Sequence, residues 1–398
     1  MLKKILFIVS DFPPPISGGN IRVYKFAKYL LRMGWSVFII YKGPNKNDKI
    51  DNDPLLAKEL LGIKMYAVND ITTKINNLFF NKSNYQNIKK TSKPKSRLYS
   101  RLFIILKYIL SYIILPDIGI LLWVPFAFKK AKELILKEKI EFIITSSPPH
   151  STQFIGKRLK KKYKNNIKWI ADFRDLWSFS PTYRLGITHN QFTNKCLEKS
   201  IINSSDEMIY ISHSMHSYVL YKLGYDKYFI QNNGKVITNG YDNEDFLSLK
   251  ISDQNIDNKK NIYEICYFGT IYGPRLQNKL ADGIKLYCKK LVTLNVQFKF
   301  IGSFSFEFKN AFKNLQNVQF VQDVSHTKAI EMMQNADVLI MILTNDIEGK
   351  IGFTGKFFEY LRAKRPILAL VPNGEVSKII YNNNIGEIAL PDSAESIA

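Results

Sequence analysis

The stretch "ILFIVSDFPPPISGGNIRVYKFAKYLLRMGWSVFIIY", residues 5–41, decides the expected fold. An apolar run over residues 5–9 is typical of a parallel strand that is covered on both faces. Apolar residues then recur at helical spacing, and a second apolar run over residues 35–41 restores a strand. Strand, helix and strand in this order predict a βαβ unit, which opens a doubly wound α/β sheet.

The same alternation continues along the chain. Strands are expected over residues 141–145, 168–171 and 207–211, and a helix is expected over residues 153–163. After Asn239-Gly240, a polar stretch without apolar periodicity predicts a linker. Beyond it, the runs "YEICYFG", "VQFKFIG", "NVQFVQ", "ADVLIMIL" and "RPILALV" alternate with helical segments.

We therefore expect two Rossmann-like domains, residues 1–245 and 246–398, facing a central cleft. The carboxyl ends of both sheets would line that cleft, which is where ligands bind in such folds. At the end of the chain, Asp392 or Ser393 is an expected N-cap with Glu395 in the first helical turn. Because a helix begins just before residue 398, we expect part of the second domain to lie beyond it.

Composition limits the functional classes. A chain of 398 residues exceeds what one hydrophobic core usually supports, and 46% hydrophobic residues exclude a disordered chain. Three cysteines without a CxxC motif indicate a reducing cytoplasm and predict no metal site. The net charge of +23 is consistent either with a lysine-rich coding bias or with an anionic partner.

A basic and apolar insertion is expected over residues 71–125. Its residues 71–116 contain no Asp or Glu, and the apolar stretch that follows the basic run is interrupted by Lys107, Pro116 and Asp117. The uninterrupted pieces are too short to span a bilayer, so an interfacial helix on an anionic membrane is favoured. A buried helix beside a solvated loop is the alternative. Nucleic-acid binding is not expected, because no known nucleic-acid-binding motif accompanies the run.

The most specific stretch is "KIGFTGKFFEYLRAKRPILALVPNG", residues 350–374. A helix is expected to begin near Gly355 or Lys356, and the free N–H groups at its start would hold a phosphate beside the Lys356 charge. Glu359 lies one turn further on the same face and would accept hydrogen bonds from ribose or sugar hydroxyls. A nucleotide diphosphate with its sugar satisfies both residues. The alternative is an ordinary surface Lys/Glu pair at i,i+3 spacing.

A second cluster, in "SSPPHST" and "ADFRDLWSFS", follows two strands of the first domain. Asp172, Arg174 and Asp175 at a strand's carboxyl end suit contact with the reacting sugar or orientation of an acceptor hydroxyl. Alternatively, Asp172 and Arg174 form a structural ion pair above Trp177. His150 reaches the same cleft or caps the next helix. No role is assigned to the other histidines: His189, His213, His216 and His326.

These motifs together resemble GT-B fold glycosyltransferases of the family-4, or group 1, set. The resemblance rests on "GKFFEYLRAKRPILA", on "CYFGTIYGPR" at the start of the second domain, on "VITNGYDNEDF" at the boundary and on the first glycine-rich loop at residues 14–22. "SSPPHST" and "ADFRDLW" resemble a subset with SxPPH and DFRDxW motifs, which is often found in polysaccharide synthesis clusters.

The resemblance implies roles for donor-site residues. Glu359 matches the family's second donor-site glutamate, a ribose ligand, whereas the first glutamate falls on Ile351. The family's two diphosphate-binding cations fall on Thr270 and Arg275. Arg275 and Lys356 are therefore the implied diphosphate clamp, with Lys279 as a weaker candidate.

The first glycine-rich loop would contribute from the acceptor side. Gly18 and Gly19 allow close backbone approach and are expected to shape the reacting end of the donor.

The implied activity is retaining, metal-independent hexosyl transfer from a nucleotide-diphosphate sugar to a glycan or lipid-linked acceptor. Fixed cations would stabilise the charge on the leaving diphosphate, and no Asp-x-Asp motif suggests a metal cofactor. The implied setting is cell-surface polysaccharide synthesis (capsule or O-antigen), with the enzyme peripheral on the inner face of the cell membrane. A nucleotide-sugar epimerase of the same fold and a non-catalytic two-lobed binding protein remain alternatives.

Overall fold

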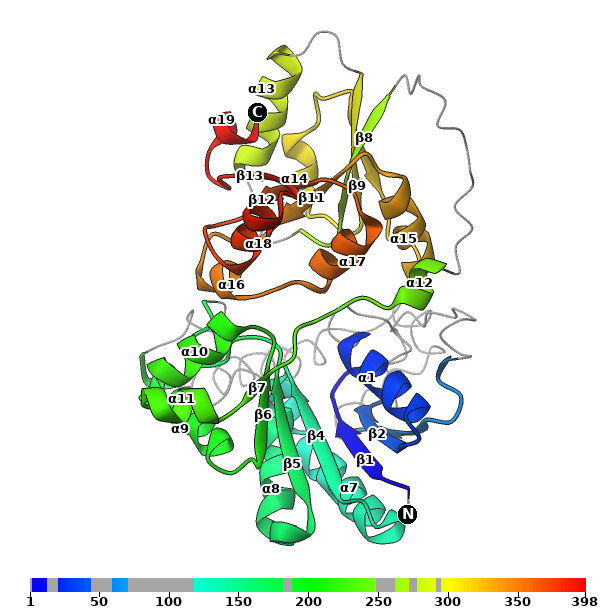
Figure 1. The fold of residues 1–398 in the computed structure, drawn as a ribbon, viewed down its shortest axis with the longest axis vertical. Helices are drawn as coiled ribbons and strands as arrows, with labels where there is room; N and C mark the ends of the chain where they lie inside the picture. The colour runs from blue at the N-terminus through cyan, green and yellow to red at the C-terminus, as the bar shows by residue number, and fades with distance from the viewer. Residues whose placement is uncertain are drawn as a thin grey trace, which may run out of the picture. The chain divides into compact units, whose positions relative to one another are not determined.

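The structure is a computed structural model that describes residues 2–12, 21–43, 59–70, 118–181, 188–247, 262–271, 278–290 and 295–398. The chain divides into two compact units, Met1–Ile237 and Thr238–Ala398. Each unit holds a parallel sheet with helices packed on it (Figure 1). The expectation of two doubly wound α/β domains is therefore confirmed.

The first unit has a seven-stranded sheet in the order β3-β2-β1-β4-β5-β6-β7, and each neighbouring pair is parallel. The order reverses between β1 and β4, which is the position at which ligands bind in parallel α/β sheets. The strands are β1 (Lys4–Ile8), β2 (Ser36–Lys42), β3 (Lys64–Val68), β4 (Phe142–Ser147), β5 (Lys168–Phe173), β6 (Glu207–Tyr210) and β7 (Lys235–Val236).

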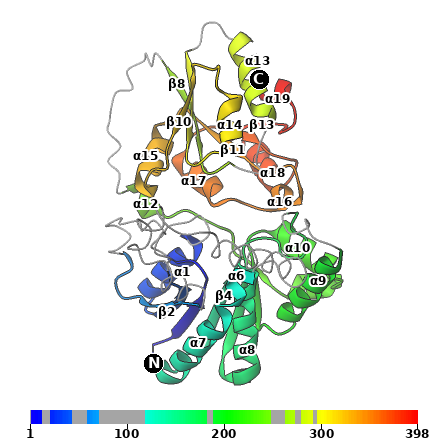
Figure 2. The ribbon, with the colours of Figure 1, turned by 180° about the vertical axis from the view of Figure 1, so that it is seen from behind.

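Helices cover this sheet because their apolar faces pack against the apolar side chains of its strands. Phe7 and Ile39 of the sheet share one apolar cluster with Val23 and Ala27 of α1. Figure 2 shows α7 and α8 side by side along the sheet. The described helices are α1 (Ile21–Arg32), α6 (Ile118–Leu121), α7 (Val124–Glu138), α8 (Gln153–Tyr163), α9 (Thr188–Ile202), α10 (His213–Lys222) and α11 (Lys227–Asn232), with 3-10 turns at His150–Thr152 and Lys164–Asn166.

The second unit repeats the first unit's topology. Its six strands follow the order β10-β9-β8-β11-β12-β13, all parallel, so the order reverses between β8 and β11. The strands are β8 (Tyr263–Phe268), β9 (Val296–Ile301), β10 (Val318–Val321), β11 (Val338–Ile342), β12 (Ile367–Leu370) and β13 (Gly386–Ala389).

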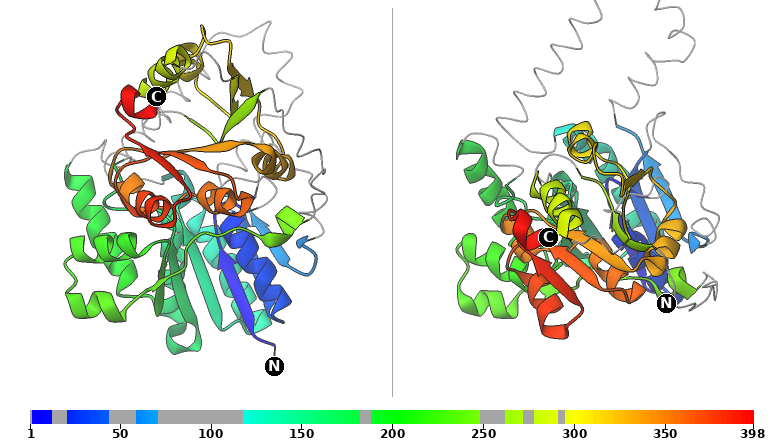
Figure 3. Two further views of the ribbon diagram at one scale, coloured as in Figure 1. Left: turned by 45° about the horizontal axis from the view of Figure 1, so that its top comes forward. Right: turned by 90° about the horizontal axis from the view of Figure 1, so that it is seen from above.

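Two apolar clusters fill the second unit. One includes Phe268, Phe357 and Ile380, and the other includes Phe300 and Phe308. The C-terminal helix α19 lies against α13, as the left view of Figure 3 shows. The helices are α12 (Asn243–Leu247), α13 (Asn278–Lys290), α14 (Phe306–Ala311), α15 (His326–Asn335), α16 (Ile347–Ile351), α17 (Gly355–Ala363), α18 (Glu375–Asn383) and α19 (Ala394–Ile397).

Two helix starts expected from the sequence are confirmed. The helix of the most specific stretch, α17, begins at Gly355. In α19 the N-cap is Ser393, whose side chain accepts a hydrogen bond from the Ser396 N–H. Both helix N-termini could be predicted because the residues that cap and begin a helix are recognisable in the local sequence.

The stretch after Gly240 that is expected to be a linker contains a short helix, α12, at residues 243–247. The helix is short and mostly polar, so it shows no apolar period. One residue, Phe246, nevertheless packs in the core of the second unit. The expected boundary at residue 245 thus falls inside α12, whereas the two units divide at residue 237.

Most of the expected insertion, residues 71–117 with the basic run, lies outside the described residues. At its described end, Trp123 and Val124 are buried, and the Trp123 indole N–H donates to the Val68 carbonyl at 2.8 Å. This end therefore packs in the first unit, whereas the apolar stretch on which the interfacial and buried-helix interpretations differ lies outside the described residues. Across the described part of the chain, no helix combines the length and apolar character needed to cross a bilayer.

Candidate functional sites

The first turn of α17 is open within the second unit. The N-cap residue Thr354 makes no side-chain cap hydrogen bond, and Gly355 is exposed. A Cβ atom added to Gly355 would meet no atom of the described residues within 4 Å. The Phe357 N–H of this turn donates to the Thr354 carbonyl at 3.2 Å, so the N–H groups of Gly355 and Lys356 are the ones that the turn can offer to an anion.

Glu359 is buried one turn into α17 and is held from two sides. Lys356 Nζ lies 2.9 Å from Glu359 Oε2, and His326 Nε2 lies 3.0 Å from Glu359 Oε1. Burial alone would raise the pKa of Glu359, but the Lys356 ammonium and the His326 hydrogen bond together lower it to about 2. At neutral pH the side chain is therefore a fixed, ionised carboxylate.

Burial separates this pair from an ordinary surface pair. Lys328 and Glu331 of α15 have the same i,i+3 spacing and a similar contact of 2.8 Å, but their side chains are 53% and 42% exposed. The Lys356 and Glu359 side chains are 33% and 9% exposed. The surface-pair alternative thus describes Lys328–Glu331 and does not describe Lys356–Glu359.

His326 is a residue that the sequence analysis did not assign. It is the first residue of α15, directly after the N-cap Ser325, in the connection that follows β10. Its Nδ1 atom lies 3.9 Å from Asp245 Oδ2 of α12. The sequence contained one signal for a site role of His326. The residue lies at the start of a helix that follows a strand of the second sheet, and such helix starts lie at the carboxyl edge of a parallel sheet.

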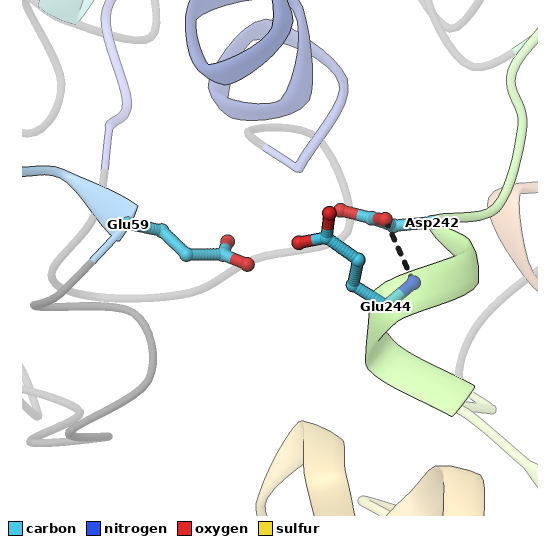
Figure 4. A group of neighbouring side chains, drawn as sticks. All are labelled: Glu59, Asp242 and Glu244. Atoms are coloured by element: carbon cyan, nitrogen blue, oxygen red, sulfur yellow. Dashed lines mark hydrogen bonds between the residues drawn. The ribbon is translucent and has the colours of Figure 1, made fainter. Parts of the chain in front are cut away.

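Helix α12 is attached to α17 near this histidine. Arg362 Nε donates to Asn243 Oδ1 at 2.7 Å, and the Arg362 guanidinium lies 5.1 Å from the centre of the Phe246 ring. At the start of the helix, the Asp242 carboxylate accepts a hydrogen bond from the Glu244 N–H at 3.1 Å (Figure 4). These contacts place Asp245 on a held element.

The other donor-site candidates are dispersed. Thr270 follows β8 and is half-buried, and Ile351 is buried, so the position implied for a first glutamate offers no polar group. Lys279 is exposed in the first turn of α13. The pKa of Glu395 on α19 is lowered by hydrogen bonds from its own backbone and Ser393 and also by the Lys279 charge, so Lys279 acts toward α19.

Gly18, Gly19 and Arg275 lie outside the described residues, and their assigned roles remain predictions.

In the first unit, Asp172 at the end of β5 is almost fully buried. Its carboxylate is 3.1 Å from the Arg22 guanidinium of α1 and accepts a hydrogen bond from the Ser146 hydroxyl at 2.6 Å. The expected alternative of an ion pair with Arg174 is therefore wrong in its partner. The first turn of α1 returns to the carboxyl edge of the sheet, which brings Arg22 to Asp172 although 150 residues separate them.

Arg174 instead binds backbone. Its guanidinium donates to the Ser147 carbonyl at 3.3 Å and to the Pro148 carbonyl. Burial lowers the pKa of Arg174, and the neighbouring Asp175 and Asp172 carboxylates oppose that shift. Asp175 is exposed, which makes it the accessible acid of the three-residue cluster.

His150 is buried and stacks on Trp177, with ring centroids 4.9 Å apart and an interplanar angle of 4°. Burial and the Arg174 charge lower the pKa of His150 to about 3, so the imidazole is neutral at physiological pH. Only the alternative of an Asp172–Arg174 ion pair expects Trp177 beneath these two side chains. The structure places it against His150, and its indole N–H donates to Asn194 Oδ1 at 3.1 Å.

A second residue of α9 holds the same loop and was also missed. Glu198 lies four residues after Asn194 and accepts a hydrogen bond from the Ser178 N–H at 3.1 Å. Burial raises the pKa of Glu198 to about 7. Asn194 and Glu198 form a polar i,i+4 pair, and such a pair usually lies on the solvent-exposed face of a helix. Their contacts with the loop could therefore be recognised only once the loop was seen packed against α9.

Comparisons with known proteins identify the fold. No protein-family model matches the sequence, and no curated protein matches it significantly. Among solved structures, the chain resembles a glycosyltransferase from Rickettsia africae ESF-5, with 19% identity and a TM-score of 0.61, covering 100% of this chain and 86% of that one.

Two further structures extend the comparison. An E. coli trehalose-6-phosphate protein bound with UDP-2-fluoro glucose matches with 10% identity and a TM-score of 0.59, over 99% of this chain and 89% of that one. A Methanocaldococcus jannaschii UDP-GlcNAc 2-epimerase in complex with UDP-GlcNAc and UDP matches with 14% identity and a TM-score of 0.50, over 99% and 91%. The expected GT-B fold is confirmed, whereas membership of the family-4 subset stays a prediction.

Proposed function

We propose that this protein is a glycosyltransferase that moves a sugar from a nucleotide-diphosphate sugar to a glycan or lipid-linked acceptor. The proposal depends on one observation: a buried, ionised Glu359 held beside Lys356, one turn into a helix whose N-terminus is open. This helix is reached from β11, one of the two strands that flank the reversal of strand order. Ligands bind at that position in parallel α/β sheets.

The geometry supports recognition of a nucleotide in two parts. The first N–H groups of α17 and the Lys356 ammonium suit the negative charge of a diphosphate. An ionised carboxylate offers about four lone-pair positions, and Lys356 and His326 occupy one each. Glu359 can therefore accept hydrogen bonds from the two hydroxyls of a ribose without losing its present partners.

The proposed reaction is retaining hexosyl transfer without a metal cofactor. As the sugar leaves, negative charge grows on the diphosphate, and Lys356 with the helix N-terminus stabilises that charge in the transition state. In the first unit, exposed Asp175 is the proposed contact to the acceptor or the reacting sugar. The buried groups Asp172, Arg174 and His150 would shape the loops around it.

The proposed setting is cell-surface polysaccharide synthesis on the inner face of the cell membrane. The support is the acid-free basic run within residues 71–116 and the net charge of +23, which suit an anionic lipid surface. Neutralising four of the lysines should weaken sedimentation with anionic liposomes but leave neutral liposomes unaffected, and unchanged sedimentation would contradict the proposal. The four are Lys89, Lys90, Lys93 and Lys95.

A thermal-shift screen with UDP-, GDP-, dTDP- and ADP-sugars tests the donor site. We expect one nucleotide class to raise the Tm of the wild type but not of Glu359→Ala. Glu331→Ala is the matched control, because it removes the carboxylate of the exposed pair with the same spacing. If no nucleotide stabilises the wild type, or Glu359→Ala responds like Glu331→Ala, the donor-site assignment is wrong.

A nucleotide-sugar epimerase is the second candidate, because one similar structure is a UDP-GlcNAc 2-epimerase in complex with UDP-GlcNAc and UDP. An epimerase converts its nucleotide sugar without an acceptor. Proton NMR of the stabilising nucleotide sugar, incubated with the protein alone, separates the two functions. Appearance of an epimeric sugar would favour the epimerase, and acceptor-dependent release of nucleoside diphosphate would favour the transferase.

A further inference from the structure

The carboxylate of Glu359 is fixed by a contact that its own helix does not supply. Lys356 belongs to α17 and is partly exposed, so its flexible side chain alone would leave the carboxylate freedom to rotate. His326 comes from α15 and reaches the other oxygen at 3.0 Å. The imidazole thereby ties the orientation of the carboxylate to a second helix.

We infer that His326 is a positioning residue for ribose recognition: its Nε2–H holds Glu359 Oε1, so that the remaining lone pairs of the carboxylate face the ribose hydroxyls. This inference rests on the proposed function. It adds a residue to which neither the sequence nor the resemblance assigned a role.

The direction of the hydrogen bond follows from chemistry. An ionised carboxylate can only accept, so the His326 Nε2 atom must carry the hydrogen. The ring's other nitrogen, Nδ1, then faces Asp245 Oδ2 at 3.9 Å. Among the described residues, the charged groups that face the ring are therefore Asp245 of α12 and Glu359 of α17.

Asp245 extends the arrangement to α12. Because α12 is attached to α17 through Arg362 and Asn243, the Asp245 carboxylate is held beside the imidazole. At 3.9 Å this carboxylate is beyond hydrogen-bond distance of Nδ1, so the hydrogen bond to Glu359, and not Asp245, fixes the imidazole.

The test compares two ligands that differ only in the ribose. Binding of UDP and of 2′,3′-dideoxy-UDP is measured by calorimetry, and the GDP and ADP pairs are measured in parallel because the base preference is not known. Wild type should prefer the ribose form, and Glu359→Gln should lose most of that preference. This comparison tests the proposed function separately: a wild type that binds no nucleotide, or shows no ribose preference, overturns it.

Variants of His326 then test the inference. His326→Leu removes the donor and should weaken binding of the ribose form about tenfold, the loss expected for one hydrogen bond to a charged group. Binding of the dideoxy form should not change. His326→Gln retains an N–H donor and should recover part of the loss.

His213→Leu is the matched control. His213 is also the first residue of a helix after a serine N-cap, but it is exposed and belongs to the first unit. Equal loss for both ligand forms in His326→Leu would mean that the histidine only stabilises the fold and would overturn the inference. A retained ribose preference in His326→Leu would overturn it as well. If His326→Leu does not fold, His326→Ala, which also removes the donor, provides the same comparison.

Discussion

Replacement of Glu359 by Gln should remove a pH-dependent part of the stability of the second unit. In the folded protein, the Lys356 ammonium and the His326 hydrogen bond outweigh the effect of burial and hold the pKa of Glu359 at about 2, against an ordinary value of 4.5. A carboxyl group whose pKa is lower in the folded state stabilises the fold at pH values above its unfolded pKa. That stabilisation is lost as the pH falls from 4.5 toward 2.

The size of the effect follows from the two pKa values. A difference of about 2.5 pKa units corresponds to about 3 kcal/mol of stabilisation at neutral pH. By pH 3 the unfolded carboxyl is almost fully protonated while the folded one is still mostly ionised, so about 2 kcal/mol of this has been lost. Gln cannot ionise, so this part of the pH dependence should be absent from Glu359→Gln.

Urea unfolding followed by circular dichroism at pH 7, 5 and 3 measures the difference. Wild type should exceed Glu359→Gln in unfolding free energy at pH 7, and the two should converge by about 2 kcal/mol on going to pH 3. Glu331→Gln, at the exposed pair, should run parallel to wild type. A constant difference between wild type and Glu359→Gln across this range would refute the assignment of a fixed, ionised carboxylate.

Two further predictions concern the first unit. Burial lowers the pKa of His150 from 6.5 to about 3, so this residue destabilises the folded state as the pH falls. Between pH 7 and pH 5, the unfolding free energy of wild type, measured by urea titration, should fall by about 2 kcal/mol more than that of His150→Phe. An equal fall in both proteins would contradict a buried neutral imidazole. Asp172→Asn should cost about 3 kcal/mol because it removes the carboxylate that is paired with the buried Arg22 guanidinium, and adding Arg22→Met should recover part of that cost. Additive costs in the double variant would show that the two side chains do not interact.

Local features were predictable from the sequence because their signals are local. The βαβ opening follows from apolar periodicity, and the start of α17 at Gly355 follows from the glycines before an apolar helix. Helix α12 was not predicted because it lacks such a local signal. Phe246 is its buried residue, and one buried residue gives no apolar periodicity.

The partners of the key carboxylates could not be read in this way. His326 is 33 residues from Glu359, and Arg22 is 150 residues from Asp172. A single sequence does not show which helix N-terminus will lie beside the carboxyl end of which strand. A parallel sheet brings the carboxyl ends of all its strands to one edge. The order of the strands decides which side chains at that edge come into contact, and this order is a property of the folded chain.

The six strands of the second sheet repeat the order of the first six strands of the first sheet, and each unit carries a buried carboxylate with a cationic partner. The two pairs nevertheless differ in what they can bind. The Asp172 and Arg22 side chains are 1% and 5% exposed, so their charges are satisfied internally and are closed to a ligand. Lys356 is 33% exposed beside an open helix start, so its charge can serve a ligand while Glu359 stays fixed beneath it. Anion recognition is therefore expected in the second unit, whereas Asp175 of the first unit is an exposed carboxylate just after the end of β5.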